Sequence, residues 1–390
     1  MSDPVTFLNE HAGGRAARSA PAPPEPYEFH RRFAEYRPSP LVEAPELAAG
    51  LGVGRLLVKD ESSRLGLPSF KMLGASWASY RALADQVGRS LSLEAWRGID
   101  DLARLLEPYR PLTLVAATDG NHGRAVARFA ALVGLEAAIY VPEGTARARI
   151  EAIEGEGASC SVVEGSYDDA VARSAEDASP RHLVVSDTSW PGYTTIPGYV
   201  IEGYSTIFRE VEDQLGGERL DSVVVPVGVG ALAASVVRAY RSDPRQWPAI
   251  IGVEPKSAAC VLESVRAGAP VLVPGPHRSI MAGLNCGRPS EIAFPLLMAG
   301  VDAFVAIDDE PVRDAMVLLA AEGVVSGETG AAALAGAREL CASGIGEEER
   351  DRLGLGPAST VLVISSEGAT DPEAYRAVVG RDPSAVEAGR

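Results

Sequence analysis

The segment Leu112–Arg124, which reads LTLVAATDGNHGR, decides the fold class of this chain. Its first five residues fit a buried strand, and residues 121–133 have the apolar period of a helix. Gly120 and Gly123 stand at the junction and allow a tight turn. The segment therefore predicts a strand that runs directly into a helix, which is the repeating unit of α/β proteins.

The same alternation of short apolar runs and longer helical segments continues along the chain and predicts an α/β fold with a mostly parallel sheet. Strands are expected at residues 56–59, 112–116, 138–141, 160–163, 183–185, 222–227, 250–253, 303–307 and 360–364. Helices are expected near residues 121–133, 196–215, 231–240, 311–322 and 328–340. A chain of 390 residues, 46% of them apolar, exceeds what one hydrophobic core normally serves. We expect a large domain from residues 1–90 and 201–390 and a small domain from residues 91–200.

The composition argues against several classes of partner. There are 36 Lys and Arg against 53 Asp and Glu, and the net charge of −17 repels nucleic-acid backbones and anionic membrane surfaces. No apolar run reaches the ~18 residues of a membrane-spanning helix, and residues 1–26 lack a secretory signal. No cysteine or histidine spacing indicates a metal. We therefore expect a cytoplasmic protein with no nucleic-acid or membrane partner, no metal and free thiols, the alternative being that Cys260 and Cys286 pair.

Lys71 is the first candidate for chemistry. It follows Phe70 at the start of an apolar helical stretch, and residues 68–75 read PSFKMLGA. Burial among Phe70, Met72 and Leu73 would disfavour the charged amine and make Lys71 available as a nucleophile. The alternative is a lysine whose side chain extends from the helix into solvent.

Asp119 and Asn121 are the second candidates, because they directly follow the strand at 112–116. Ligands of α/β sheets collect at the carboxyl ends of strands. There Asp119 offers an acid or base, and Asn121 offers a hydrogen-bonding amide. In the alternative interpretation, Asp119 only caps the following helix. We interpret His122 as a packed or turn-stabilising residue.

The loop Gly228-Val229-Gly230-Ala231 lies between a predicted strand and a predicted helix. Backbone amides at such a helix start bind phosphate groups. The stretch also fits the looser dinucleotide pattern GxGxxA, with Glu254 at the position of a ribose-binding acid. A dinucleotide-binding oxidoreductase is therefore a competing hypothesis.

Two further polar clusters follow apolar strands. Asp187 lies in SDTSW at 186–190, and Ser365 lies in VISSEG at 363–368. Each cluster alone is also consistent with an ordinary turn or helix start. Together with Lys71 and the phosphate loop, they are what a bound phosphorylated aldehyde cofactor would need.

These motifs together resemble the fold type II pyridoxal-phosphate enzymes, and within them the diaminopropionate ammonia-lyases. The matching segments are YRPSPL (36–41), VKDES (58–62), FKMLG (70–74), TDGNHGR (118–124), DTSWPGY (187–193), GVGA (228–231), IMAGLNCG (280–287), SGETG (326–330) and ISSEG (364–368). TDGNHGR, DTSWPGY and IMAGLNCG separate the ammonia-lyases from the threonine and serine dehydratases. The chain departs from the lyase pattern in having few glycines after GVGA, and Ser366 where threonine is usual.

The resemblance implies two open, twisted, mostly parallel sheets with helices on both faces and an active site in the cleft between the domains. It implies pyridoxal 5'-phosphate bound as a Schiff base to Lys71, with Phe70 packed nearby and Asn121 hydrogen-bonded to the phenolic oxygen. The loop 228–231 would cradle the phosphate. Ser365, or else the serine after it, would face the pyridine nitrogen.

The resemblance also implies the reaction, the removal of the β-amino group of 2,3-diaminopropionate to give pyruvate and two ammonia molecules. Lys71, Asp119 and Asp187 would carry catalysis, with Lys71 taking the Cα proton of the L-isomer and Asp119 that of the D-isomer. Asp187 would assist Lys71 or bind the departing ammonium. A homodimer is expected. The alternatives are a threonine or serine dehydratase-like activity, or a β-replacement enzyme acting on another β-substituted amino acid.

Overall fold

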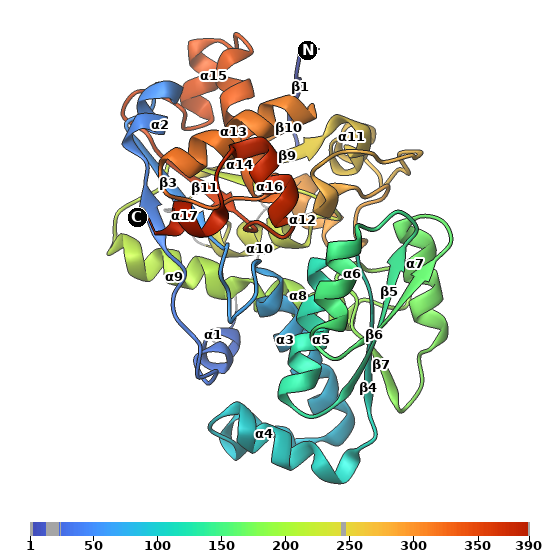
Figure 1. The fold of residues 1–390 in the computed structure, drawn as a ribbon. Helices are drawn as coiled ribbons and strands as arrows, with labels where there is room; N and C mark the ends of the chain where they lie inside the picture. Colours follow the sequence, from blue (N-terminus) through green and yellow to red (C-terminus); the bar gives the residue numbers. More distant parts are fainter. Residues whose placement is uncertain (1–2, 13–22, 24, 243–246, 389–390) are drawn as a thin grey trace. The chain divides into compact units, whose positions relative to one another are not determined.

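Two β-sheets organise the chain in the computed structural model, which describes residues 3–12, 23, 25–242 and 247–388 (Figure 1). Unit 1 consists of Met1–Ala22, Pro38–Ser63 and Ile207–Arg390, and unit 2 of Pro23–Arg37 and Arg64–Thr206. These boundaries differ from the predicted domains, because residues 23–37, 64–90 and 201–206 fall in unit 2. Helix α3 (Lys71–Val87) packs against α5 (Asn121–Leu132) and α8 (Thr195–Gly203) of that unit.

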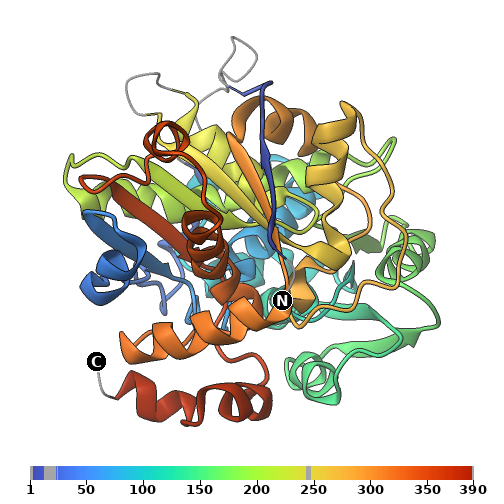
Figure 2. The same ribbon diagram turned by 90° about the horizontal axis from the view of Figure 1, so that it is seen from above.

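Unit 1 is built on a seven-stranded sheet in the order β1-β10-β9-β8-β11-β3-β2. Its strands are β1 (Val5–Leu8), β2 (Leu41–Glu43), β3 (Arg55–Asp60), β8 (Ser222–Pro226), β9 (Ala249–Pro255), β10 (Ala303–Ile307) and β11 (Thr360–Ser365). The strands are parallel except for β1 and β2, which pair antiparallel at the two edges. Strand β11 lies between β8 and β3, and Figure 2 shows it in red beside blue β3.

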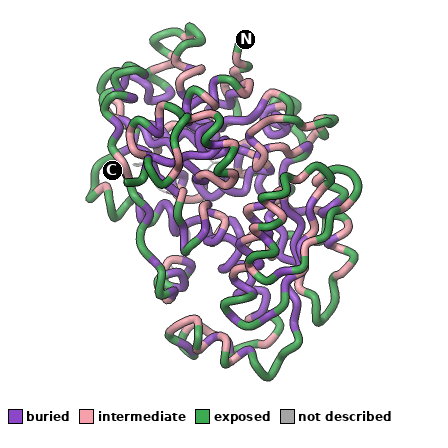
Figure 3. Tube along the Cα trace, viewed as in Figure 1, coloured by how far each residue is buried: buried purple, intermediate pink, exposed green. Residues whose placement is uncertain are grey.

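Helices cover both faces of this sheet. Helices α2 (Pro45–Leu51), α13 (Asp309–Ala321) and α14 (Glu328–Ala342) share one core with alternate strand residues such as Val224 and Val361. Helix α10 (Ala231–Tyr240) packs on β8 and β9. Because both faces are covered, every residue of β8 and β10 is buried, as the purple segments of Figure 3 show for the sheet regions. The other helices are α9 (Ser205–Leu215), α11 (Cys260–Ala267), α12 (Phe294–Gly300), α15 (Glu347–Arg352), α16 (Pro372–Val379) and α17 (Pro383–Glu387).

Unit 2 is built on a parallel four-stranded sheet in the order β6-β5-β4-β7. Its strands are β4 (Thr113–Ala117), β5 (Glu136–Pro142), β6 (Ser159–Val163) and β7 (His182–Val184). Its other helices are α1 (Glu25–His30), α4 (Ile99–Leu106), α6 (Arg147–Glu154) and α7 (Tyr167–Glu176). Phe29 of α1 packs on the rings of Tyr80 and Trp96, at centroid distances of 4.9 and 5.8 Å. This aromatic cluster explains why Pro23–Arg37 belongs to unit 2.

The structure confirms the predicted α/β class and every predicted strand, each within two residues of its expected ends. The helix predicted at 196–215 is divided into α8 and α9 at Tyr204. Across the described ranges, every helix is too short or too polar to span a bilayer.

Candidate active site

Asp119 and Asp187 follow neighbouring strands of the sheet in unit 2. Strands β4 and β7 pair in parallel, and the Val185 amide continues the ladder by donating to the Val115 carbonyl. The carboxyl ends of parallel strands meet at one edge of a sheet, which is where ligands bind in α/β folds. Both carboxylates lie close enough to Lys71 to influence its protonation.

Lys71 is the first residue of α3 and contacts Asp187 directly. Its Nζ is 2.6 Å from Oδ2 of Asp187, and the two side chains are only 17% and 7% exposed. The Phe70 ring centroid is 5.3 Å from the same Nζ, within the range in which an aromatic face attracts a cation. The structure therefore brings Lys71, Phe70 and Asp187 together.

The ion pair reverses the protonation expected for Lys71. Burial lowers the pKa of the Lys71 amine, but its neighbours, above all the Asp187 carboxylate, together outweigh burial and raise that pKa well above its usual range. Burial likewise raises the pKa of Asp187, but the neighbouring Lys71, His122 and Tyr167, above all the Lys71 ammonium, together outweigh burial and hold that pKa well below its usual range. The expectation that burial would disfavour the charged amine is wrong, because it considered only the apolar neighbours in the sequence, whereas the nucleophilic role of Lys71 stays a prediction.

Tyr167, which was not assigned to the site, also holds Asp187, and His122 lies beside the same carboxylate. The Tyr167 hydroxyl donates to Oδ1 of Asp187 at 3.1 Å, and Nδ1 of His122 is 3.9 Å from Oδ2. Nε2 of His122 donates to the Val185 carbonyl at 2.8 Å, so Nδ1 is the unprotonated nitrogen of the neutral ring. Burial lowers the pKa of His122, which favours this neutral form. Tyr167 follows strand β6, and this position after a strand is the signal that could have identified it.

Asp119 and Asn121 occupy the turn between β4 and α5, and both are half-buried. Gly120 has a φ of +147°, which L-residues rarely adopt. Arg149 of α6 donates to the Asp119 carbonyl at 3.3 Å and thereby holds the turn. The N-cap of α5 is Gly120, with no side-chain hydrogen bond. Asp119 therefore lies one residue before the N-cap position.

The loop 228–231 joins β8 to α10 in unit 1, as predicted. Gly230 has a φ of +100° and is the N-cap of α10, whose first amides lack partners within the helix. A Cβ on Gly228 would lie 2.9 Å from the carbonyl oxygen of Gly283. Glycine therefore lets the segment IMAGLNCG pack against the loop, and the amides at this helix start suit a phosphate group.

Ser365 ends strand β11, which pairs with β8, so Ser365 and the loop 228–231 leave the sheet at the same edge. The buried Ser365 hydroxyl is 2.8 Å from the Ser326 hydroxyl. The Ser366 hydroxyl is buried and has no partner among the described residues. The nearby Glu367 accepts a hydrogen bond from the Thr329 amide at 3.1 Å. The end of β11 therefore presents hydroxyl groups, while the neighbouring carboxylate binds backbone.

The chain contains three lysines, and their contacts single out Lys71. Lys59 is fully buried, and its Nζ donates to Glu210 at 2.8 Å and to two further oxygen atoms at 2.9 Å. Lys256 pairs with Asp308 at 2.9 Å. Lys71 alone lies beside a predicted catalytic acid.

Glu254, the acid of the dinucleotide hypothesis, binds the backbone of its own chain. Its two carboxylate oxygens accept hydrogen bonds from the amides of Val261 and Leu262, each at 2.8 Å, in the first turn of α11. Burial raises the pKa of Glu254 to about 8. This buried helix-capping carboxylate contradicts the ribose-binding role.

Within the described ranges the cysteines, Cys260 and Cys286 among them, are not joined by a disulfide. Both lie near Gly228: Sγ of Cys260 is 3.8 Å from its carbonyl oxygen, and Sγ of Cys286 would be 3.4 Å from a Cβ placed on it. Within those ranges, no cluster of three or more His, Cys, Asp or Glu side chains is arranged to hold a metal ion.

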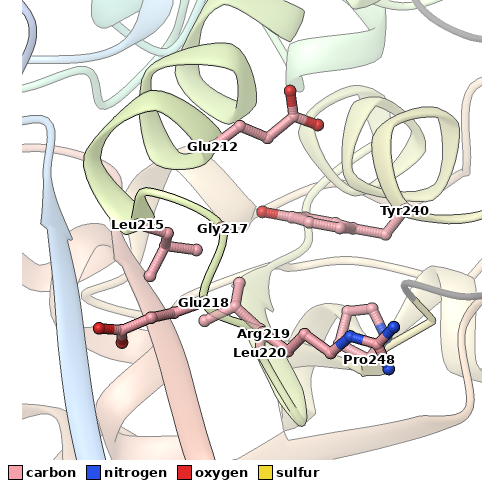
Figure 4. A pocket seen from close by; sticks show the side chains of 8 residues that line it. All are labelled: Glu212, Leu215, Gly217, Glu218, Arg219, Leu220, Tyr240 and Pro248. Carbon is pink, nitrogen blue, oxygen red and sulfur yellow. The ribbon is translucent and has the colours of Figure 1, made fainter.

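A pocket of about 390 Å³ opens elsewhere in unit 1 (Figure 4). It is lined by the end of α9, the turn that follows and two residues beyond: Glu212, Leu215, Gly217, Glu218, Arg219, Leu220, Tyr240 and Pro248. None of the predicted site residues lines this pocket. The candidate active site is therefore defined by Lys71, Asp187 and their neighbours rather than by this cavity.

These features are those of an α/β enzyme that binds a phosphorylated aldehyde cofactor: a buried lysine paired with an acid, a glycine loop at a helix start, and two mostly parallel sheets. The profile of the family described as pyridoxal-phosphate dependent enzymes matches residues 33–366, so the chain belongs to that family.

Within that family, the chain groups with the diaminopropionate ammonia-lyases. It is 36% identical to the enzyme of Escherichia coli (strain K12), and the match covers 92% of this chain and 91% of the relative. The Salmonella typhimurium enzyme is 34% identical over the same shares. The crystal structure of the E. coli enzyme in complex with D-serine has a TM-score of 0.86 at 33% identity and covers 97% of both chains. The same enzyme with an aminoacrylate-PLP azomethine reaction intermediate gives 0.85 at 32% identity, again covering 97% of each chain. These matches confirm the predicted family and the fold type II architecture.

Proposed function

We propose that the protein is a diaminopropionate ammonia-lyase, which converts 2,3-diaminopropionate and water into pyruvate and two ammonia molecules. The observation that carries the proposal is the 2.6 Å contact between Lys71 and Asp187. This contact joins the lysine expected to anchor the cofactor to an acid expected to act on the substrate. The names of the relatives support the same activity.

The residues present fit pyridoxal phosphate. Lys71 would bind it covalently beside Phe70, and Asn121 would bind its phenolic oxygen. The loop 228–231 would hold the phosphate, since the amides at a helix start lack partners within the helix and Gly228 leaves no room for a side chain. Ser365 would face the pyridine nitrogen with a hydroxyl. When bound, the cofactor supplies the sink for the electron pair left at Cα after deprotonation.

Proton transfer is assigned to Lys71 and Asp119. The Cα proton of the L-isomer and that of the D-isomer point to opposite faces of a planar bound substrate, so one base cannot reach both. Lys71 takes the proton of the L-isomer, and it does so only as the neutral amine. Asp119 takes the proton of the D-isomer from the other face. Asp187 stays ionised and holds the departing β-ammonium.

Charge favours a substrate with two amino groups. Diaminopropionate can carry two ammonium groups against one carboxylate, and Asp119 and Asp187 offer two negative charges. An ammonium about 4 Å from a carboxylate gains roughly 4 kcal/mol at an effective dielectric constant near 20. Serine and threonine carry only one ammonium and gain less from the second acid.

The deciding experiment is incubation with D- and L-diaminopropionate, D- and L-serine, and threonine, followed by assay of keto acid and ammonia. Diaminopropionate should react best and release two ammonia molecules per pyruvate. Faster turnover of serine or threonine, with one ammonia per keto acid, would favour the dehydratase-like alternative. Formation of a new amino acid only when a second nucleophile is added would favour β-replacement.

We also propose that the protein works as a cytoplasmic homodimer. The lack of disulfides among the described residues is consistent with a reducing compartment. Size-exclusion chromatography with light scattering should give twice the 40.8 kDa of one chain. Fractionation of cells should recover the protein with cytoplasmic markers. A mass of one chain, or recovery with membranes, would contradict the respective statement.

A further inference from the structure

Tyr204, at the break between α8 and α9, packs on the face of α3 that carries Lys71. Its ring centroid is 4.7 Å from that of Phe70. A Cβ on Gly74 would lie 2.4 Å from Cε1 of Tyr204, so the ring occupies the space that this glycine leaves open. Gly74 is three residues after Lys71, and residues at this spacing share one face of a helix.

The Tyr204 hydroxyl is a buried polar group near the Lys71 amine. The residue is fully buried, and within the described ranges its hydroxyl makes no hydrogen bond of good geometry, although the Lys71 amine lies near enough to lower its pKa through a side-chain hydrogen bond. Leaving such a group unsatisfied is costly. A lysine ammonium carries three N–H donors, and in this structure one of those of Lys71 goes to Asp187. Lys71 therefore has N–H groups to spare, and the Tyr204 oxygen, which packs on the same face of α3, can accept a hydrogen bond.

The charges around the hydroxyl favour its neutral form. Burial raises the pKa of Tyr204 well above its usual range, and Asp187 and Asp119 act in the same direction, while Lys71 opposes them. The titratable groups that face Lys71 are Asp187, Asp119, Tyr204 and His122. Tyr204 is thus a neutral phenol beside two carboxylates, and its oxygen can accept a hydrogen bond from an ammonium.

We propose that Tyr204 is a positioning residue for Lys71, whose protonated amine donates a hydrogen bond to the Tyr204 hydroxyl oxygen. The inference rests on the proposed function, in which Lys71 takes the Cα proton of the L-isomer. In that step the C–H bond breaks, the proton joins the lone pair of Nζ, and the electron pair stays with the substrate and cofactor. Tyr204 neither gains nor loses a proton. It stabilises the ammonium that forms, and so makes Lys71 a stronger base.

The test compares Tyr204→Phe with Tyr80→Phe in the full-length protein. Both substitutions remove one hydroxyl from a buried tyrosine of unit 2, but the Tyr80 hydroxyl donates to the Leu91 carbonyl at 2.6 Å, away from the site. Cofactor is removed, and the acetylation rate of Lys71 is measured by mass spectrometry at pH 8. Without the Tyr204 hydroxyl, the pKa of Lys71 should fall by about one pH unit, and acetylation should be about tenfold faster. Tyr80→Phe should match the wild type.

Lys59 reports on the fold in the same digest, because its fully buried Nζ reacts only when the protein opens. Unchanged or slower acetylation of Lys71 in Tyr204→Phe would overturn the inference. If Lys59 also becomes reactive, Gly74→Ala replaces the first variant, since it displaces the ring while keeping the hydroxyl. Faster acetylation of Lys71 alone in Gly74→Ala would support the inference, and an unchanged rate would overturn it.

Turnover of the cofactor-loaded enzyme gives a second readout. Tyr204→Phe should slow the L-isomer more than the D-isomer, because only the L-isomer uses Lys71 as its base. Equal losses for both isomers would contradict the positioning role. The two proposals fail separately: no reaction of wild-type enzyme with diaminopropionate would reject the function, whereas the acetylation result depends only on the surroundings of Lys71.

Discussion

Replacing Asp187 with asparagine should free Lys71 from its ammonium form. The interacting atoms are 2.6 Å apart. At that separation and an effective dielectric constant of about 20, Coulomb's law gives roughly 6 kcal/mol of gross attraction. Desolvation offsets part of it, and breaking a buried ion pair typically costs about 3 to 5 kcal/mol. At about 1.36 kcal/mol per pH unit, the pKa of Lys71 should fall by about 2 to 4.

The assay is the rate at which protein without cofactor bonds to added pyridoxal phosphate. Only the neutral amine forms the covalent C=N link, so a lower pKa of Lys71 speeds the reaction at neutral pH. A stopped-flow record of the absorbance that grows at roughly 410–420 nm should show faster binding in Asp187→Asn. Asp119→Asn serves as the control, because Asp119 contributes less to the pKa of Lys71.

The ion pair also defines a pH window for stability. The pKa of Asp187 lies below its ordinary value of 3.8, so its contribution is present above that pH and is lost as pH falls. The pKa of Lys71 lies above its ordinary value of 10.5, so its contribution is present below that pH and is lost at higher pH. Wild type should therefore exceed Asp187→Asn in free energy of unfolding between these limits.

In the stopped-flow assay, slower cofactor binding by Asp187→Asn than by wild type at every pH would refute the reasoning that Asp187 keeps Lys71 protonated.

Four other outcomes are expected. Borohydride reduction of the cofactor-loaded protein should label Lys71 in a peptide map, and a label on either other lysine would overturn the anchor assignment. Asp119→Asn should slow the D-isomer by ~10²- to 10⁴-fold and spare the L-isomer; equal losses would leave Asp119 as a turn residue. Ser365→Asp should change the absorbance spectrum and the ratio of elimination to transamination, and an unchanged spectrum and ratio would exclude Ser365 as the partner of the pyridine nitrogen. Burial raises the pKa of Glu254 from 4.5 to about 8, so the folded state binds this proton more tightly and stability should fall as pH rises through that interval. Denaturant unfolding of Glu254→Gln should show a flatter pH dependence, and an equally steep one would assign the effect to other groups.

The central strands could be predicted because their local sequence contains the cause of their structure. Strands β4, β8 and β10 are buried throughout, so their apolar runs are unambiguous. The edge strand β1 was missed because its residues are partly exposed and it forms only by pairing with a distant segment, as Val5 does with Ala306. Burial on both faces is visible in sequence, whereas edge pairing depends on distant partners.

The same distinction applies to the site. Each residue expected after a strand lies there, because a strand followed by polar residues is a local pattern. The protonation of Lys71 was mispredicted because its partner, Asp187, is 116 residues away in the chain. Tyr167 and Tyr204 were overlooked for the same reason, since their roles come from neighbours that only the fold supplies.

The position of β11 in the seven-stranded sheet has a consequence for synthesis on the ribosome. Strand β3 ends at Asp60, and the partner that joins it to β8 starts only at Thr360. At translation rates of about 5–20 residues per second, β3 waits roughly 15 to 60 s for that partner. Unit 2 ends at Thr206 and can fold in the meantime. A nascent chain stalled before Thr360 would therefore carry a finished unit 2 and an unpaired edge of β3, which is a template for aggregation.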